Sequence, residues 1–134
     1  MKKYQIRLLP RVRAGFPSPA TDYLKNEIDF NQLLKPRPAS IITAEVVGDS
    51  MVDAFIPPHS IVVVDRSIKP RNNSIVIATL DGENYIKHLV RSNDGIFLLA
   101  ANDKYQSIRI TEHMDFSVWG TVTHVIIDVM NPRI

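Results

Sequence analysis

The sequence predicts a mostly β fold. It consists of compact, partly rolled antiparallel sheets, with an extended N-terminal arm and one short helix. From Ser40 onward, short runs rich in valine and isoleucine alternate with Gly, Pro, Asn and Asp, which is typical of consecutive strands. Two runs, 61–64 and 75–78, lack polar alternation, and this indicates strands covered on both faces. The pair Asp81-Gly82 lies between two such runs and favours a tight hairpin.

The chain has 134 residues, 45% of them hydrophobic, which is enough for one compact domain with a core. The segment Lys35-Pro36-Arg37-Pro38 places prolines at alternate positions, where they remove backbone donors that a helix or sheet would need. We therefore expect an arm over residues 1–38 and a β-rich domain over residues 39–134.

In chain order, the first expected element is the short helix of the arm. Ser18 can cap it with Pro19 at its first position, and partial helical spacing follows as far as Ile28. Asn93-Asp94-Gly95 predicts a second turn between strands. The expected strands lie near residues 41–47, 60–65, 74–80, 84–91, 95–99, 107–110 and 116–129.

The composition excludes several kinds of site. The chain has no cysteine, which rules out disulfides and thiolate chemistry and is compatible with a reducing cytosol. The four histidines lack the close pairing of a zinc site, so we expect no metal and no cofactor. No run approaches the roughly 20 apolar residues of a membrane helix, so we expect a cytoplasmic protein that does not bind membranes.

A candidate nucleophile lies in Gly48-Asp49-Ser50-Met51, between a strand-like run and a possible helical turn at residues 52–55. A serine placed there exposes its hydroxyl among free backbone amides, which could stabilise an oxyanion. Gly48 and Met51 flank it as the residues expected to serve substrate approach and the oxyanion. By itself the tetrapeptide is more typical of an ordinary capped loop.

A candidate base lies inside a predicted strand. Alternation places Lys87 on one face with Tyr85 and Leu89. If that face is buried, desolvation lowers the pKa of the lysine, and a neutral amine can accept a proton from Ser50. Two other interpretations stay open: the ammonium could extend to water, or a Ser-His-Asp arrangement could use His88 or His124 as the base.

Together these segments resemble the UmuD family, relatives of the C-terminal half of the LexA repressor, whose peptidase fold is similar to that of signal peptidase. The spacing of Ser50 and Lys87 agrees with the family. The matching segments are Ala14-Gly15-Phe16-Pro17-Ser18-Pro19-Ala20, Asp29-Phe30-Asn31-Gln32-Leu33-Leu34, Gly48-Asp49-Ser50-Met51, Ile75-Val76-Ile77-Ala78, Ile86-Lys87, Asn102-Asp103-Lys104-Tyr105 and Gly120-Thr121-Val122.

The resemblance implies a self-cleaving serine peptidase with Ser50 as nucleophile and Lys87 as general base. It implies a scissile bond between Ala14 and Gly15 in the chain's own arm. It further implies stimulation by a RecA filament on single-stranded DNA during the DNA-damage (SOS) response. The shortened homodimer would then join a UmuC-type subunit in error-prone translesion DNA synthesis.

Two alternatives remain. A self-cleaving repressor-like regulator would need a DNA-binding module before the cleavage site, and only fourteen residues precede it here, so we expect no direct sequence-specific DNA binding. A non-catalytic interaction module that regulates a polymerase would show no processing at all.

Overall fold

A computed structural model of the chain describes Gly15 and residues 28–130. The chain divides into two compact units, Met1–Pro36 and Arg37–Ile134. The expected boundary between arm and peptidase domain, at residues 38 and 39, stays a prediction.

Among the described residues of the first unit there is one helix, α1 (Phe30–Leu34). Asp29 caps it, because its carboxylate accepts hydrogen bonds from the backbone N–H groups of Asn31 and Gln32, which have no partner within the helix. The helix expected after Pro19 lies outside the described residues except for Ile28, which is not helical.

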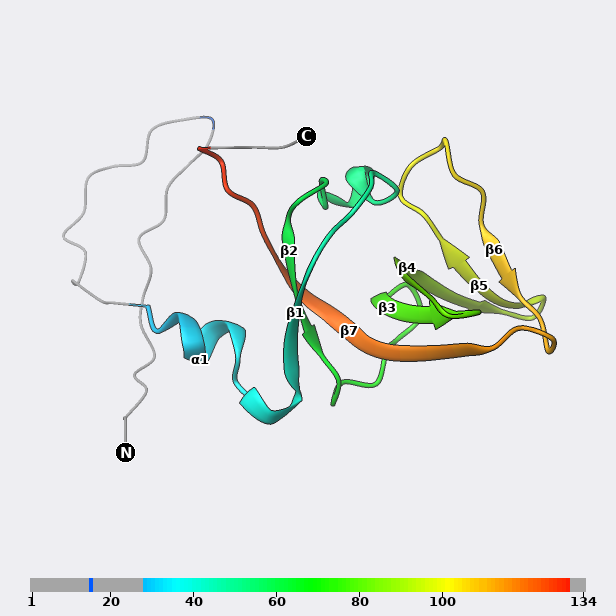
Figure 1. Cartoon of the computed structure of the whole chain (residues 1–134), viewed down its shortest axis with the longest axis horizontal. Helices are drawn as coiled ribbons and strands as arrows, with labels where there is room; N and C mark the ends of the chain where they lie inside the picture. Colours follow the sequence, from blue (N-terminus) through cyan, green and yellow to red (C-terminus); the bar gives the residue numbers. More distant parts are fainter. Residues whose placement is uncertain (1–14, 16–27, 131–134) are drawn as a thin grey trace. The chain divides into compact units, whose positions relative to one another are not determined.

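The second unit is a seven-stranded sheet in the order β1-β2-β7-β3-β4-β5-β6, and all neighbouring strands are antiparallel. This arrangement confirms the predicted mostly β fold with one short helix (Figure 1). The elements are η1 (Pro38–Ser40), β1 (Ile41–Glu45), η2 (Val52–Ala54), β2 (Ile61–Asp65), β3 (Ile75–Leu80), β4 (Glu83–Ser92), β5 (Gly95–Leu99), β6 (Ile108–Ile110) and β7 (Phe116–Ile126).

The strand β7 joins the two halves of the sheet. Its first part pairs with β3 and its second part with β2, so it runs along the domain beside both (Figure 1). An extra residue interrupts each pairing, Trp119 opposite β3 and Thr123 opposite β2. Such bulges bend a strand and increase its twist, and they allow β7 to serve both neighbours.

The predicted turns form as hairpins. Asp81 (φ 50°) and Gly82 (φ 84°) connect β3 to β4 with left-handed backbone at both central positions, as a two-residue hairpin favours. A second hairpin pairs Ser92 with Gly95 between β4 and β5.

Two predicted strands are longer than the observed ones. The first was expected to reach residue 47 but ends at Glu45, although Val46 still exchanges backbone hydrogen bonds with the 59–60 segment. The last was expected to reach residue 129 but ends at Ile126, because the Asp128 carboxylate accepts the Met130 N–H in a local turn.

Asp65, at the end of β2, is fully buried and anchors the start of the domain. One carboxylate oxygen accepts hydrogen bonds from Ser40 and from the backbone and side chain of Ser67; the other accepts two from Arg37. Burial raises the pKa of Asp65, but these hydrogen bonds outweigh it and hold the pKa far below its usual range.

One hydrophobic cluster is formed by the segment between β1 and β2 together with β2 and β3. Its buried residues are Val46, Met51, Ile56, Val62, Val64 and Ile77. A second cluster, Val76, Ala78, Leu89 and Leu98, lies between β3, β4 and β5. In the part of the chain that the structure describes, no helix has the length and apolarity needed to cross a membrane.

Candidate functional site

The structure brings Ser50 and Lys87 together. Ser50 lies in the turn after β1 and Lys87 in the middle of β4, 37 residues apart in sequence. The Lys87 Nζ and Ser50 Oγ atoms are 2.6 Å apart and hydrogen-bonded. At this distance a neutral amine can take the hydroxyl proton directly, without an intervening water.

The strand alternation places Lys87 as predicted, on the buried face of β4 with Leu89. Lys87 is only 7% exposed, and burial lowers its pKa. The rings of Tyr85 and Tyr105 lie 5.8 and 5.5 Å from Nζ and enclose it further. The ammonium therefore does not extend to open water, and the fraction of neutral amine at a given pH is larger than for an exposed lysine.

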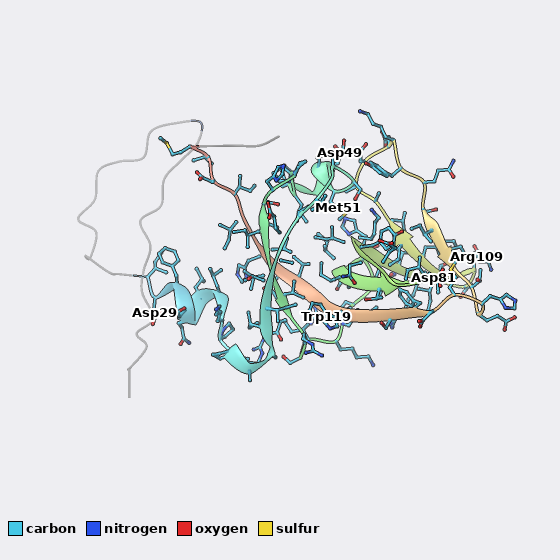
Figure 2. The ribbon with its side chains drawn as sticks, viewed as in Figure 1. Asp29, Asp49, Met51, Asp81, Arg109 and Trp119 are labelled. Atoms are coloured by element: carbon cyan, nitrogen blue, oxygen red, sulfur yellow. The ribbon has the colours of Figure 1, made fainter. Side chains whose placement is uncertain are left out.

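The conformation of the turn that carries Ser50 depends on Gly48 before it and Met51 after it. Gly48 has φ +86°, a left-handed conformation that glycine adopts without strain, and a Cβ there would meet no atom within 4 Å. Gly48 is thus required by the backbone conformation of the turn. The side chain of Met51 is 1% exposed and packs in the hydrophobic cluster, while Asp49 lies above it at the upper edge of the domain in this view (Figure 2).

A pocket of about 580 Å³ opens beside the two residues. One wall is formed by the chain from Ala44 to Ser50 and the other by β4 from Asn84 to Lys87. Trp119, on the β7 bulge, also lines it. Because β1 is the first strand of the sheet order, an extended peptide could lie in this pocket beside the 44–50 segment.

Comparisons with known proteins identify the family of the chain. Residues 7–123 match the family described as Peptidase S24-like. The chain belongs to the Peptidase S24 family. Members of this family are self-cleaving serine peptidases with a Ser-Lys dyad, so the chain is an S24 peptidase by membership.

Individual relatives cover most of the chain. It is 37% identical to Protein ImpA of Salmonella typhimurium over 117 residues. This aligned region covers 87% of this chain and 79% of ImpA. The chain is 33% identical over 121 residues to Protein MucA of Escherichia coli, with 90% and 82% covered. LexA repressor 1 of Xanthomonas campestris is 39% identical over 114 residues, which cover 84% of this chain and 56% of that repressor.

The alternative with a histidine base finds no support in this S24 peptidase. His88 Nδ1 lies 3.0 Å from the Asn73 carbonyl oxygen, and His124 Nδ1 lies 2.9 Å from Thr123 Oγ1. Neither histidine lines the pocket beside Ser50.

The expected cleavage site falls at the edge of what the structure describes. Ala14 lies outside the described residues, and Gly15 is described alone, with an exposed backbone bend. The Ala14–Gly15 bond therefore stays a prediction.

The loop between β5 and β6 supports the turn that carries Ser50, a role that was not predicted from the sequence. Ala101 N–H donates to the Ser50 carbonyl at 2.8 Å, and the Asn102 side chain donates to the Asp49 carbonyl at 2.9 Å. The Tyr105 hydroxyl donates to the Asp49 carboxylate at 2.5 Å. The segment Asn102-Asp103-Lys104-Tyr105 was identified only as one of the segments that resemble the UmuD family. No local sequence pattern links it to a turn more than 50 residues earlier.

Proposed function

We propose that Ser50 is the nucleophile and Lys87 the general base of a self-cleavage reaction at the Ala14–Gly15 bond. The observation that carries this proposal is the 2.6 Å contact between Lys87 Nζ and Ser50 Oγ on a buried face. The small side chain of Ala14 and the bare Gly15 would leave the attacked carbonyl uncrowded.

The proposed reaction has two halves. Neutral Lys87 takes the hydroxyl proton as Ser50 Oγ attacks the Ala14 carbonyl carbon, and the resulting ammonium gives that proton to the Gly15 nitrogen as the C–N bond breaks. A water molecule, deprotonated by Lys87, then attacks the acyl ester, releases residues 1–14 and restores the Ser50 hydroxyl.

The oxyanion formed in both halves needs hydrogen-bond donors. The backbone N–H groups of Ser50 and Met51 donate no hydrogen bond to another described residue, whereas the N–H groups of Val52 and Asp53 do. We assign the oxyanion to these two free N–H groups, with Gly48 shaping the turn that presents them. The Met51 side chain serves by packing in the core, and only its backbone faces the reaction.

In the cell, we propose that this reaction is a switch in the SOS response, stimulated by a RecA filament on single-stranded DNA. The shortened chain would act in the cytoplasm as a homodimer with a UmuC-type polymerase subunit in translesion synthesis. The family membership and the relatives ImpA and MucA support this role. Residues 1–14 carry five basic and no acidic side chains, so cleavage would change the formal charge from +2 to −3.

The decisive experiment follows the mass of the purified full chain with time between neutral and strongly alkaline pH. Because a buried lysine must lose its proton to act, the loss of residues 1–14 should speed up as the pH rises. Ser50→Ala and Lys87→Ala should abolish it. The exposed residues Ser117 and Lys69 provide matched controls, and their alanine variants should cut at the wild-type rate.

Other results would point elsewhere. Persistence of the intact mass at every pH, with and without a RecA filament, would favour a non-catalytic interaction module. Cleavage that does not require Ser50 would exclude the dyad. The match to LexA repressor 1 covers only 56% of that repressor, so a repressor-like regulator is not favoured; sequence-specific retention of duplex DNA by the intact chain would reverse this conclusion.

A further inference from the structure

The loop between β5 and β6 reaches across to the turn that carries Ser50. In Figure 1 this loop and the η2 turn lie at the same side of the domain, and four hydrogen bonds join them. Two are between backbones, Ala101 N–H to Ser50 O and Asp53 N–H to Ala101 O, both 2.8 Å. The other two come from side chains, Asn102 and Tyr105, and both end on Asp49.

The two side-chain bonds hold different parts of Asp49. The Asn102 side chain donates to the backbone carbonyl of Asp49 at 2.9 Å, and this carbonyl belongs to the peptide unit that ends in the Ser50 N–H. Tyr105 binds its carboxylate at 2.5 Å. The same tyrosine ring lies 5.5 Å from Lys87 Nζ, so one residue contacts the neighbour of the nucleophile and covers the base.

We propose that Asn102 and Tyr105 are positioning residues of the dyad, which hold Ser50 against Lys87 by clamping Asp49 and which keep the Asp49 carboxylate from pairing with the lysine. This inference rests on the proposed function of Ser50 and Lys87. It assigns to the loop a task that neither dyad residue performs alone.

The second half of the proposal concerns charge. Asp49 lines the same pocket as Lys87, yet no ion pair joins them among the described residues, and the carboxylate is bound by Tyr105 instead. A carboxylate released beside an ammonium stabilises the charged form and raises the pKa of the lysine. The hydrogen bond to Asp49 in turn raises the pKa of Tyr105, which favours the protonated phenol that donates to the carboxylate.

The other titratable groups near Lys87 have contacts of their own. The Glu45 carboxylate, on β1, is engaged with His59 Nδ1 at 3.2 Å. Tyr85, on β4, contributes its ring at 5.8 Å. The titratable groups that line the pocket with Lys87 are Glu45, Asp49, Tyr85 and Tyr105.

The test measures the rate of self-cleavage of the full chain against pH. Tyr105→Phe keeps the ring and removes the hydroxyl. We expect it to move the midpoint of the pH profile upward by about 1 unit, which by itself slows cleavage about tenfold at neutral pH. We also expect the plateau rate above the midpoint to fall about tenfold, because the clamp is broken. Adding Asp49→Asn should return the midpoint toward the wild-type value without restoring the plateau rate, because the carboxylate is gone but the clamp is still broken.

Asn102 tests positioning without the charge. Asn102→Ala should slow cleavage about tenfold with an unchanged midpoint, because no charged group is altered. The control is Asn72→Ala, which removes a comparable bridge, from Asn72 Oδ1 to the Arg91 N–H at 2.8 Å, away from the site. It should cut at the wild-type rate, and thermal unfolding of each variant should verify that it is folded.

The outcomes separate this inference from the proposed function. If the wild type requires Ser50 and Lys87 but Tyr105→Phe and Asn102→Ala match its rate and midpoint, the dyad stands and the clamp is wrong. If Tyr105→Phe slows cleavage with no change of midpoint, and Asp49→Asn has no effect on that variant, the charge half is wrong. If cleavage does not require Ser50, the proposed function itself fails.

Discussion

Asp65 offers a prediction whose size follows from the structure. Asp65→Asn keeps the shape of the side chain but replaces one carboxylate oxygen by an NH₂ group. The oxygen that binds Ser40 and Ser67 can be retained, so the NH₂ group faces the two Arg37 donors, whose Nε and Nη2 atoms lie 3.1 and 2.5 Å from Asp65 Oδ2. Two hydrogen bonds to a charged group are lost, and two sets of donors face each other.

Each such bond contributes about 1.5–3 kcal/mol, so the two together stabilise the fold by about 3–6 kcal/mol. Arg37 is 52% exposed and can turn to water after the substitution, which recovers part of this loss. We therefore expect the free energy of unfolding to fall by about 3 kcal/mol, toward the lower end of that range. Urea denaturation at pH 7 measures it, in a Ser50→Ala background that prevents self-cleavage.

The pH dependence gives a second readout. Because the pKa of Asp65 is lowered in the folded state, its stabilisation is complete above the unfolded-state pKa of about 3.9 and is lost as the pH falls toward the folded-state pKa. The gap between wild type and Asp65→Asn should therefore shrink below about pH 4. The control is Asp94→Asn, an exposed turn residue, which should change stability by less than about 0.5 kcal/mol. An Asp65→Asn effect no larger than this control would refute the argument.

Three further predictions concern the pocket and the sheet. Lys87→Met should raise the free energy of unfolding at neutral pH, because burial disfavours the ammonium. The difference between this variant and the wild type should narrow by up to about 1.4 kcal/mol per pH unit as the pH rises toward about 10.4. A difference that does not change with pH in urea denaturation would contradict this prediction. Gly48→Ala should lower the free energy of unfolding by about 1 kcal/mol, because the backbone at this position is left-handed. Gly120→Ala should lower it by about 2–3 kcal/mol, because the added Cβ would lie 2.5 Å from Val64 Cγ1. Equal losses of stability in thermal denaturation would count against this distinction. Trp119→Ala should slow self-cleavage severalfold with an unchanged pH midpoint, because it removes a pocket wall and leaves the dyad intact; a shifted midpoint would show that Trp119 acts on Lys87.

Much of the fold could be predicted because its signals are local. The apolar runs at 61–64 and 75–78 became β2 and β3, in which consecutive residues are buried and both faces are therefore covered, and Asp81-Gly82 formed the expected hairpin. The alternation around Lys87 placed the lysine on the buried face for the same reason. A period of two in a strand determines which side chains share a face, whatever the rest of the chain does.

The contacts between distant residues could not be predicted in this way. Asp65 looked like the polar end of a strand, and nothing near it indicates that it is buried against Arg37, 28 residues earlier. Tyr105 and Asp49 are 56 residues apart, and their hydrogen bond depends on how the sheet brings two loops together. The ends of β1 and β7 were overestimated because apolar residues such as Val47 continue beyond the ladder, where they are exposed.

The two residues of the proposed dyad are supported in different ways. Lys87 belongs to a ten-residue strand and pairs with Val76 on β3, so moving it requires disrupting the sheet. Ser50 lies in a turn, and a handful of hydrogen bonds from a surface loop complete its support. Local opening of a loop takes much less free energy than opening of a sheet. Under the proposed mechanism, the sheet would hold the base in place while the position of the nucleophile would depend on a surface loop. Substitutions in that loop would then change the rate of the cut without disrupting the strand pairing around Lys87.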